Sequence, residues 1–126
     1  MFKNLRIVYI TTSDRDEART IGRAIVEKRL AACVNIVDGM ESIYHWKGQI
    51  ETANECILIA KTPYHNVSNL TALVKELHSY ENPAIVSLTM TEQEGNEDYL
   101  MWLLREASHP DIESGASRME SDLPSP

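Results

Sequence analysis

Two long β-rich runs, separated by only two residues, are the feature that most limits how this chain can fold. The runs cover residues 32–46 and 49–62, and Lys47-Gly48 lies between them, where a two-residue hairpin turn belongs and glycine supplies a positive φ. A strand usually has about 5–6 residues, so each run is more than twice the ordinary length. A strand of about 14 residues reaches about 45 Å, whereas a helix of about 16 residues reaches only about 24 Å. The sequence therefore predicts a hairpin that extends past the helices packed against it.

The far part of this hairpin carries apolar side chains. They are Met40, Ile43, Tyr44, Trp46 and Ile50. An isolated two-stranded ribbon is only marginally stable in water, so a further surface must cover these side chains. A neighbouring subunit is the simplest source of that surface, and the hairpin therefore predicts an oligomer.

Before the hairpin, the pattern predicts a strand followed by a helix. Residues 5–12 are rich in Ile, Val, Tyr and Thr, with apolar side chains on both faces, as in a strand that is buried on both sides. Ser13 is the expected N-cap of a helix over 14–29, because acidic residues fill the first turn and apolar residues recur at helical spacing.

After the hairpin, the pattern predicts a helix, a strand and a last helix. Thr62-Pro63 has the form of an N-cap followed by a proline at the first helical position, and predicts a helix that runs to about His78. A fourth strand is expected over 84–91, and Asn96 is expected to cap the last helix. The order β-α-β-β-α-β plus a terminal helix predicts an α+β fold with a ferredoxin-like antiparallel sheet.

In such a fold both helices cover one face of the sheet and leave the other bare. Yet the first, third and fourth strands are apolar on both faces; in the third, Cys56 and Leu58 alternate with Ile57 and Ile59. An exposed apolar sheet face of this size marks an interaction surface. Oligomerisation is thus predicted a second time, independently of the hairpin.

The length of 126 residues fits one domain, and the charge is unevenly spread along it. Residues 108–126 carry −3 of the formal net charge of −7, and 9 of these 19 residues are Ser, Pro or Gly. Such a stretch cannot bury enough apolar surface to become ordered, which predicts a folded domain over 1–107 and a disordered acidic tail over 108–126. The acidic balance argues against nucleic acid and anionic membranes as partners.

The sequence predicts a cytoplasmic protein. The apolar run over residues 7–10 is too short for the core of a signal peptide, and no window approaches 18 consecutive apolar residues. Two cysteines, Cys33 and Cys56, are too few for a disulfide framework and lack C-x-x-C spacing. Each is expected to be a small core residue.

Motifs of the common catalytic types are absent from the sequence. It contains no G-x-S-x-G, no Gly-rich phosphate loop and no H-x-x-x-H metal pair, and nothing favours a Cys–His dyad. These absences predict a binding protein rather than an enzyme, with no certain cofactor.

One loop gathers candidate site residues. His78, Tyr80 and Glu81 bring an imidazole, a phenol and a carboxylate to a helix-to-strand junction, where functional sites often lie. Lys61, at the end of the third strand, is expected to project toward a cleft, and a Lys–Glu pair there is either a site or a structural ion pair. Trp46, beside the hairpin turn, is either a ligand platform or an interface anchor, and the interface role is favoured.

The same residues carry a resemblance to a known family. The matching segments are 30–36 (LAACVNI), 42–50 (SIYHWKGQI), 55–62 (ECILIAKT), 78–83 (HSYENP) and 98–103 (DYLMWL). In this order and spacing the chain resembles the CutA family of divalent-ion tolerance proteins. The resemblance implies a ferredoxin-like subunit in an intertwined homotrimer, similar in build to the PII-type signalling trimers, whose ligands bind in clefts between subunits.

The resemblance also implies a link with tolerance to copper and other divalent cations. Two departures from the family pattern bear on this link. The usual His-Pro-Tyr has Ser79 in place of proline, so the loop loses a fixed φ. Members thought to bind copper carry a Cys and a second His at positions that hold Ile10 and Leu77 here, which leaves His78 as the metal donor.

The leading hypothesis is a cytoplasmic homotrimeric binding or signalling protein with a site at the subunit cleft. Lys61 would bind a small anionic ligand or pair with Glu81, Tyr80 would donate a hydrogen bond, and Trp46 would line the cleft. The metal hypothesis is weak binding of Cu²⁺ or another divalent cation through His78. Further alternatives are a PII-like trimer for a small anion or nucleotide, an enzyme acting on an anionic metabolite, and a structural scaffold trimer without metal.

Overall fold

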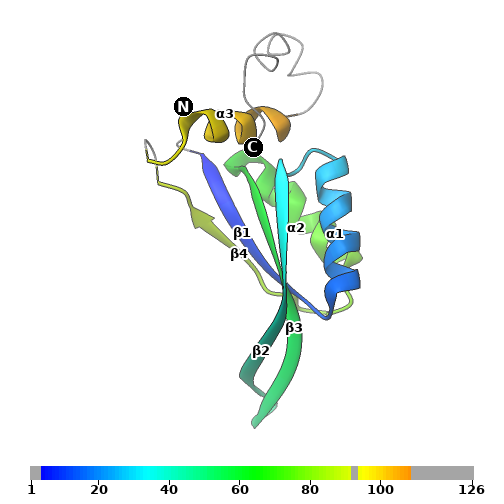
Figure 1. Cartoon of the computed structure of the whole chain (residues 1–126). Helices are drawn as coiled ribbons and strands as arrows, with labels where there is room; N and C mark the ends of the chain where they lie inside the picture. Colours follow the sequence, from blue (N-terminus) through cyan, green and yellow to red (C-terminus); the bar gives the residue numbers. More distant parts are fainter. Residues whose placement is uncertain (1–3, 92–93, 109–126) are drawn as a thin grey trace.

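The computed structural model describes residues 4–91 and 94–108 and has the predicted element order. The elements are β1 (Leu5–Thr12), α1 (Arg15–Glu27), β2 (Cys33–Trp46), β3 (Gln49–Pro63), the 3-10 turn η1 (Tyr64–Asn66), α2 (Val67–Leu77), β4 (Ile85–Thr89) and α3 (Glu97–Glu106). The strands form one antiparallel sheet in the order β2-β3-β1-β4, with α1 and α2 on one face (Figure 1). The predicted α+β, ferredoxin-like arrangement is confirmed.

The β2–β3 hairpin extends far beyond the rest of the sheet (Figure 1). β1 pairs with β3 only along residues 56–63, so residues 49–55 of β3 pair with β2 alone. An irregularity in the ladder between Val37 and Met40 marks where the two-stranded part begins on β2. We call this two-stranded part, residues 40–55, the arm.

The arm has the predicted turn and an exposed apolar tip. Lys47 and Gly48 both have positive φ, 50° and 80°, as a type I′ hairpin turn requires. Ile43, Trp46 and Ile50 are 67%, 54% and 69% exposed. The subunit therefore leaves large apolar side chains of the arm in contact with solvent.

The core lies between the sheet and the helices α1 and α2, and consists of small and aliphatic side chains. It contains Val8, Ile10, Ala18, Ile21, Ile25, Ala31, Cys56, Leu58, Ala60, Leu70 and Val74. Gly22 lets α1 approach the sheet, because a Cβ there would lie 3.1 Å from Val34 Cγ2 and 3.2 Å from Leu58 Cδ1. Cys56 is a buried core residue as predicted, whereas Cys33 is only half-buried.

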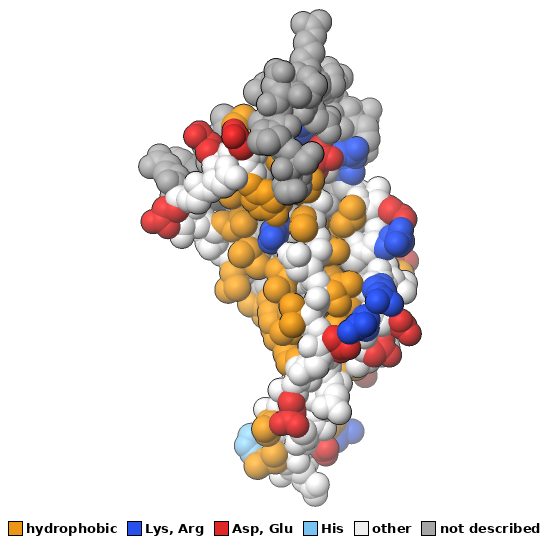
Figure 2. Space-filling view, in the orientation of Figure 1, with side chains coloured by type: hydrophobic (Ala, Val, Ile, Leu, Met, Phe, Trp, Pro, Cys, Tyr) orange, Lys and Arg blue, Asp and Glu red, His pale blue; other side chains and the backbone are white. Residues whose placement is uncertain are grey.

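The opposite face of the sheet is apolar and largely uncovered. Residues on it, which we call the open face, are Ile7, Tyr9, Val37, Ile57, Ile59, Val86 and Leu88. Val86 and Leu88 are 50% and 52% exposed. Among residues 4–91 and 94–108, α3 covers one end of this face, where Leu103 packs against Leu5. Figure 2 shows hydrophobic side chains gathered over the sheet, as the sequence predicts.

The N-cap of α1 is one residue later than predicted. Asp14, not Ser13, caps the helix, because its carboxylate accepts a hydrogen bond from the Glu17 backbone N–H at 2.8 Å. Ser13 instead donates its own backbone N–H to the Glu17 carboxylate at 3.0 Å. The helix spans Arg15–Glu27 rather than 14–29.

Thr62-Pro63 ends β3 and does not begin α2, so this prediction is wrong. The Thr62 hydroxyl donates to the Leu30 carbonyl oxygen at 2.6 Å and accepts from the Asn66 side-chain amide at 3.2 Å. The long-range hydrogen bond to Leu30 holds Thr62 in the sheet, and α2 begins only at Val67, after the turn η1.

The end of the chain follows the prediction where the structure describes it. β4 spans Ile85–Thr89, shorter than the expected 84–91, and Asn96 caps α3 as predicted, accepting from the Asp98 N–H at 3.1 Å. The predicted tail over 108–126 lies outside the described residues, except Ser108, which donates to the Leu104 carbonyl oxygen at 2.8 Å. None of the described helices has both the length and the apolar character needed to cross a membrane.

Replacing Thr62 with Val tests its role in joining β3 to the loops around it. The variant Thr62→Val keeps the shape of the side chain but leaves the partly buried Leu30 carbonyl without its donor, which we expect to destabilise the protein by about 1–2 kcal/mol. Thermal unfolding at one fixed protein concentration measures the effect. Thr20→Val, at an exposed position of α1, is the matched control and should leave the unfolding midpoint unchanged. Equal effects at both positions would contradict this role.

Candidate functional site

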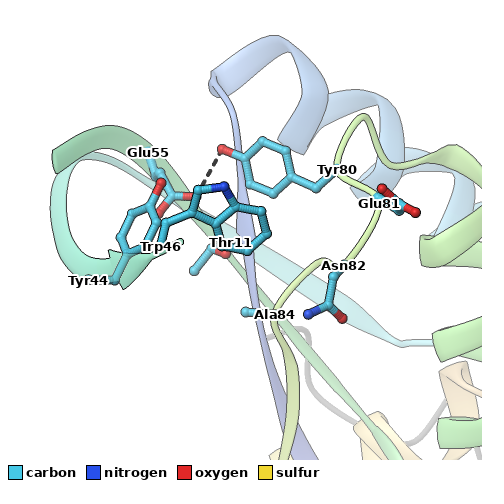
Figure 3. Close-up of a pocket in the computed structure, with 8 residues that line it drawn as sticks. All are labelled: Thr11, Tyr44, Trp46, Glu55, Tyr80, Glu81, Asn82 and Ala84. Atoms are coloured by element: carbon cyan, nitrogen blue, oxygen red, sulfur yellow. Dashed lines mark hydrogen bonds between the residues drawn. The ribbon is translucent and has the colours of Figure 1, made fainter. Parts of the chain in front are cut away.

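A pocket of about 780 Å³ lies between the arm and the loop that follows α2 (Figure 3). Its lining residues are Thr11 of β1, Tyr44 and Trp46 of β2, Glu55 of β3, and Tyr80, Glu81, Asn82 and Ala84 of the loop. Four separate segments of the chain thus meet at one place. The volume falls in the range of roughly 300–1,000 Å³ that is typical of small-molecule sites.

A hydrogen bond between Tyr80 and Glu55 joins the loop to the base of the arm. The Tyr80 hydroxyl donates to Glu55 Oε2 at 2.9 Å. Burial, together with the hydrogen bond and the negative charge of Glu55, raises the pKa of Tyr80 to about 12. The phenol is therefore neutral at physiological pH, and Glu55 is held at the pocket wall by a directed contact.

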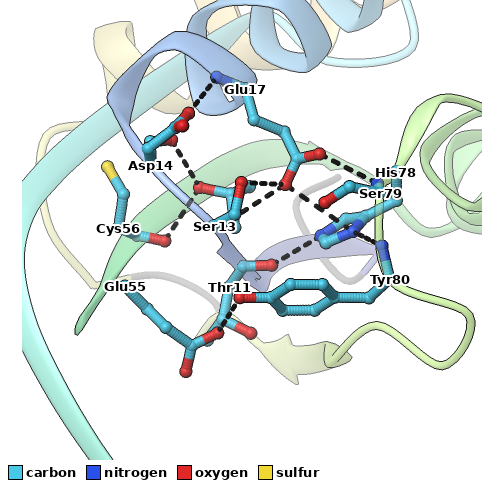
Figure 4. A network of polar contacts seen from close by, with 10 residues as sticks. Thr11, Ser13, Asp14, Glu17, Glu55, Cys56, His78, Ser79 and Tyr80 are labelled. Atoms are coloured by element: carbon cyan, nitrogen blue, oxygen red, sulfur yellow. Dashed lines mark hydrogen bonds and ion pairs between the residues drawn. The ribbon is translucent and has the colours of Figure 1, made fainter. Parts of the chain in front are cut away.

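The side chain of His78 is fully buried. Its two ring nitrogens fix the start of this loop (Figure 4). Its Nδ1 accepts a hydrogen bond from the Tyr80 backbone N–H at 3.0 Å, which requires this nitrogen to be unprotonated. Its Nε2 therefore carries the proton and donates to the Thr11 carbonyl oxygen at 2.7 Å. Both ring nitrogens are engaged, so a metal ion at His78 would have to displace one of these hydrogen bonds.

Glu17 connects α1 to the same loop (Figure 4). One carboxylate oxygen accepts from the Ser13 N–H and hydroxyl at 3.0 and 3.1 Å, and the other accepts from the Ser79 N–H at 2.8 Å. Burial alone would raise the pKa of Glu17, but the hydrogen bonds from Ser13 and Ser79 outweigh burial and leave the pKa below its ordinary value. The charged Glu17 carboxylate therefore holds the loop against the start of α1. We call this set of hydrogen bonds, from Ser13 and Ser79 to Glu17, the clamp.

Lys61 lies at the other end of the sheet from the pocket. It stands opposite Ile7 on β1, four residues before Thr11, and its Nζ contacts the Tyr99 hydroxyl at 3.2 Å. Four strand residues correspond to about 13 Å. A pair between Lys61 and Glu81 is therefore not formed within one subunit, because the strand separates them.

The structure brings together three of the residues predicted for the site and adds others. Trp46, Tyr80 and Glu81 line one pocket, whereas Lys61 does not. Sequence reasoning missed Glu55, the partner of Tyr80, although it opens one of the segments on which the family resemblance rests. The two-residue period of a strand places Tyr44 on the same face as Trp46, and this signal was available in the sequence.

The described residues contain no group of three or more His, Cys, Asp and Glu side chains arranged to hold a metal ion. Compact divalent cations are usually held by several protein oxygen or nitrogen donors. The prediction that His78 is a metal ligand stays a prediction, since it depends on release of the ring from its hydrogen bonds.

Comparison with known proteins agrees with this fold. The chain is an α+β protein with a ferredoxin-like sheet, a two-stranded arm and a pocket between the arm and the loop after α2. The model of the CutA1 divalent ion tolerance protein family matches residues 6–106. The chain therefore belongs to the CutA1 family.

Individual relatives support the same assignment. The chain is 48% identical over 97 residues to the divalent-cation tolerance protein CutA of Thermus thermophilus, covering 77% of this chain and 92% of that protein. It is 41% identical over 95 residues to human protein CutA, covering 75% of this chain but only 52% of that protein. The chain also spans about half the length of the Arabidopsis thaliana relative, 52%.

Solved structures of CutA1 proteins have the same fold. A CutA1 structure from Thermus thermophilus superposes with a TM-score of 0.77 at 45% identity, covering 82% of this chain and 99% of that one. A CutA1 structure from Oryza sativa gives a TM-score of 0.79 at 36% identity, covering 85% and 95%.

The clamp at Glu17 predicts a specific dependence of stability on pH. Because the folded-state pKa of Glu17 is lowered, its contribution is complete above the unfolded pKa of about 4.3 and is lost as pH falls through the folded value. We expect Glu17→Gln to lower the free energy of unfolding by about 1–2 kcal/mol at pH 7. Between pH 6 and 3, the stability of this variant should fall less than that of the wild type. Thermal unfolding across this range measures both effects.

Glu76→Gln is the control for this measurement, because it removes the same charge from an exposed position on α2. Its pH profile should match that of the wild type. Parallel pH profiles for wild type and Glu17→Gln would contradict the clamp.

Proposed function

We propose that the chain is a homotrimeric, cytoplasmic binding or signalling protein in the divalent-cation tolerance family, with the pocket beside the arm as its ligand site. One observation carries this proposal: the described residues leave both an apolar face of the sheet and the tip of the arm, at Ile43 and Ile50, largely exposed. The ligand and the cation response then belong to the assembled protein rather than to one chain.

Association of subunits would cover both the arm and the open face. An arm that packs on the open face of the next subunit buries apolar side chains on both sides, at roughly 25 cal/mol for each Å² of apolar surface. Such a head-to-tail contact uses two different surfaces and produces a ring when the rotation closes. The ring of three subunits is taken from the resemblance to intertwined CutA trimers.

Binding, rather than catalysis, suits the chemistry of the pocket. The residues that line it include two carboxylates, three aromatic rings and one Thr hydroxyl, but no imidazole or thiol side chain. Cys56 is buried, and burial raises the pKa of its thiol, which leaves it a poor nucleophile. Both described cysteines are free, which suits a reducing compartment such as the cytoplasm.

The anion-binding alternative belongs at a different place, around Lys61. Lys61 is half-buried at the edge of the open face, and Tyr99 is its described hydrogen-bond partner. Subunit association would bury this ammonium further, so it would need a counter-charge from a neighbouring subunit or a small anionic ligand. A PII-like role in binding an anion or nucleotide would therefore centre on Lys61 rather than on the aromatic pocket.

The oligomer is tested by its mass in solution. We expect sedimentation equilibrium at micromolar concentration to give about 43 kDa, three times the 14.3 kDa of the chain. Val86→Asp, which places a charge on the open face, should shift the mass to that of the monomer, because an unpaired carboxylate is costly to bury.

Val26→Asp is the matched control, since Val26 is 38% exposed on α1, away from the open face. This variant should keep the wild-type mass. A wild-type mass of 14.3 kDa, or an unchanged mass for Val86→Asp, would overturn the proposed assembly.

Direct binding of copper through His78 is the second candidate, and the family's link with divalent ions favours it. We expect binding to be weak, because Cu²⁺ must compete with the hydrogen bonds to Thr11 and Tyr80. Titration followed by the visible d–d band should show weak binding that His78→Ala removes and His65→Ala, at an exposed position, retains. Equal binding by His78→Ala would exclude His78 as the ligand.

A further inference from the structure

The pocket beside the arm has an unusual combination of aromatic and acidic walls (Figure 3). The titratable carboxylates that line it are Glu55 and Glu81, and the lining residues include no Lys, Arg or His. Tyr44, Trp46 and Tyr80 supply three aromatic rings. A pocket with this lining repels anions and attracts positive charge.

The Glu55 carboxylate has a fixed position and an oxygen that can accept a further hydrogen bond. Tyr80 donates to Glu55 Oε2, and no described hydrogen bond uses Oε1. A carboxylate has about four lone-pair positions, so Glu55 is able to accept a ligand donor while it keeps its contact with Tyr80. The directed bond from the phenol also reduces the conformational freedom that Glu55 would lose on binding.

The aromatic wall distinguishes between kinds of cation. Ring faces attract organic ammonium ions, and Trp is the most effective of the aromatic residues. Compact ions such as Mg²⁺ and Ca²⁺ instead require several oxygen donors. Trp46 already lies near an ammonium of the chain, since Lys47 Nζ is 6.0 Å from its ring centroid, at the outer limit of such a contact.

We propose that this pocket binds an organic ammonium ion, with Glu55 as the counter-charge and with Trp46 and Tyr44 as the ring faces around the cation. The volume of about 780 Å³ accommodates a small alkylammonium compound. The inference rests on the proposed function, because it assigns a ligand class to the same pocket. It replaces the anionic ligand expected for Trp46, Tyr80 and Glu81 with a cationic one.

Choline and its neutral isostere 3,3-dimethylbutan-1-ol provide a direct test on the full chain. The two have the same shape and differ in charge. We expect isothermal titration calorimetry to show binding of choline and at least about tenfold weaker binding of the isostere. A tenfold loss of affinity is what the loss of one cation–π contact or one ion pair with a carboxylate would cause. Inorganic phosphate, the anionic probe, should not bind at this pocket.

Variants then locate the site. Glu55→Gln keeps an acceptor for Tyr80 but removes the charge, and Trp46→Leu removes the ring; each should weaken choline binding about tenfold. Trp46→Phe retains a ring and should have a smaller effect. Glu76→Gln removes one negative charge from an exposed position on α2, as a control for Glu55→Gln. This variant should bind choline like the wild type.

The outcomes separate this inference from the proposed assembly. A trimer that binds no choline, that binds the neutral isostere equally well, or that keeps wild-type affinity in both Glu55→Gln and Trp46→Leu would overturn the ammonium site alone. Thermal unfolding and sedimentation of each variant show whether it is folded and assembled. A monomeric wild type would overturn the proposed assembly whether or not choline binds.

Discussion

The length of the β2–β3 hairpin is the constraint on which the rest of this structure depends. β1 reaches only residues 56–63 of β3, so within the described residues the arm has no further strand beside it and no helix over it. Its tip exposes Ile43 and Ile50, and the sheet leaves Val86 and Leu88 half exposed on the open face. A two-stranded ribbon has little stability by itself. The apolar surfaces of the arm and of the open face are therefore the basis of the proposed association with other copies of the chain.

The same arm also creates the pocket. Its opposite wall is the loop after α2, which is held by three contacts from different elements: Glu17 accepts from Ser79, His78 donates to the Thr11 carbonyl, and Tyr80 donates to Glu55. These contacts hold the loop although Ser79 lacks the fixed φ that a proline would supply. The pocket is thus built from the arm on one side and a hydrogen-bonded loop on the other, and its position depends on the subunit fold.

The sequence was sufficient to predict the parts of the fold that depend on local pattern. The turn at Lys47-Gly48, the overlong strands and the apolar open face all follow from residue type and period. It was not sufficient where distant groups compete for a residue. Thr62-Pro63 has the local form of a helix start, but the Leu30 carbonyl, 32 positions away, holds Thr62 in the sheet. The site was predicted in part for the same reason: Tyr80 was identified, but the register that brings Glu55 to it, and keeps Lys61 away, is a property of the folded sheet.

Hydrogen exchange of the backbone amides in the arm tests the central claim most directly. If other subunits cover the arm, the cross-strand amides of residues 40–55 should exchange as slowly as those of β1, because both lie in the stable assembled core. Dilution that dissociates the assembly should then accelerate exchange in the arm before it affects β1. Rapid exchange throughout the arm at concentrations where β1 is fully protected would contradict the account, since it would show a ribbon that opens freely in solution.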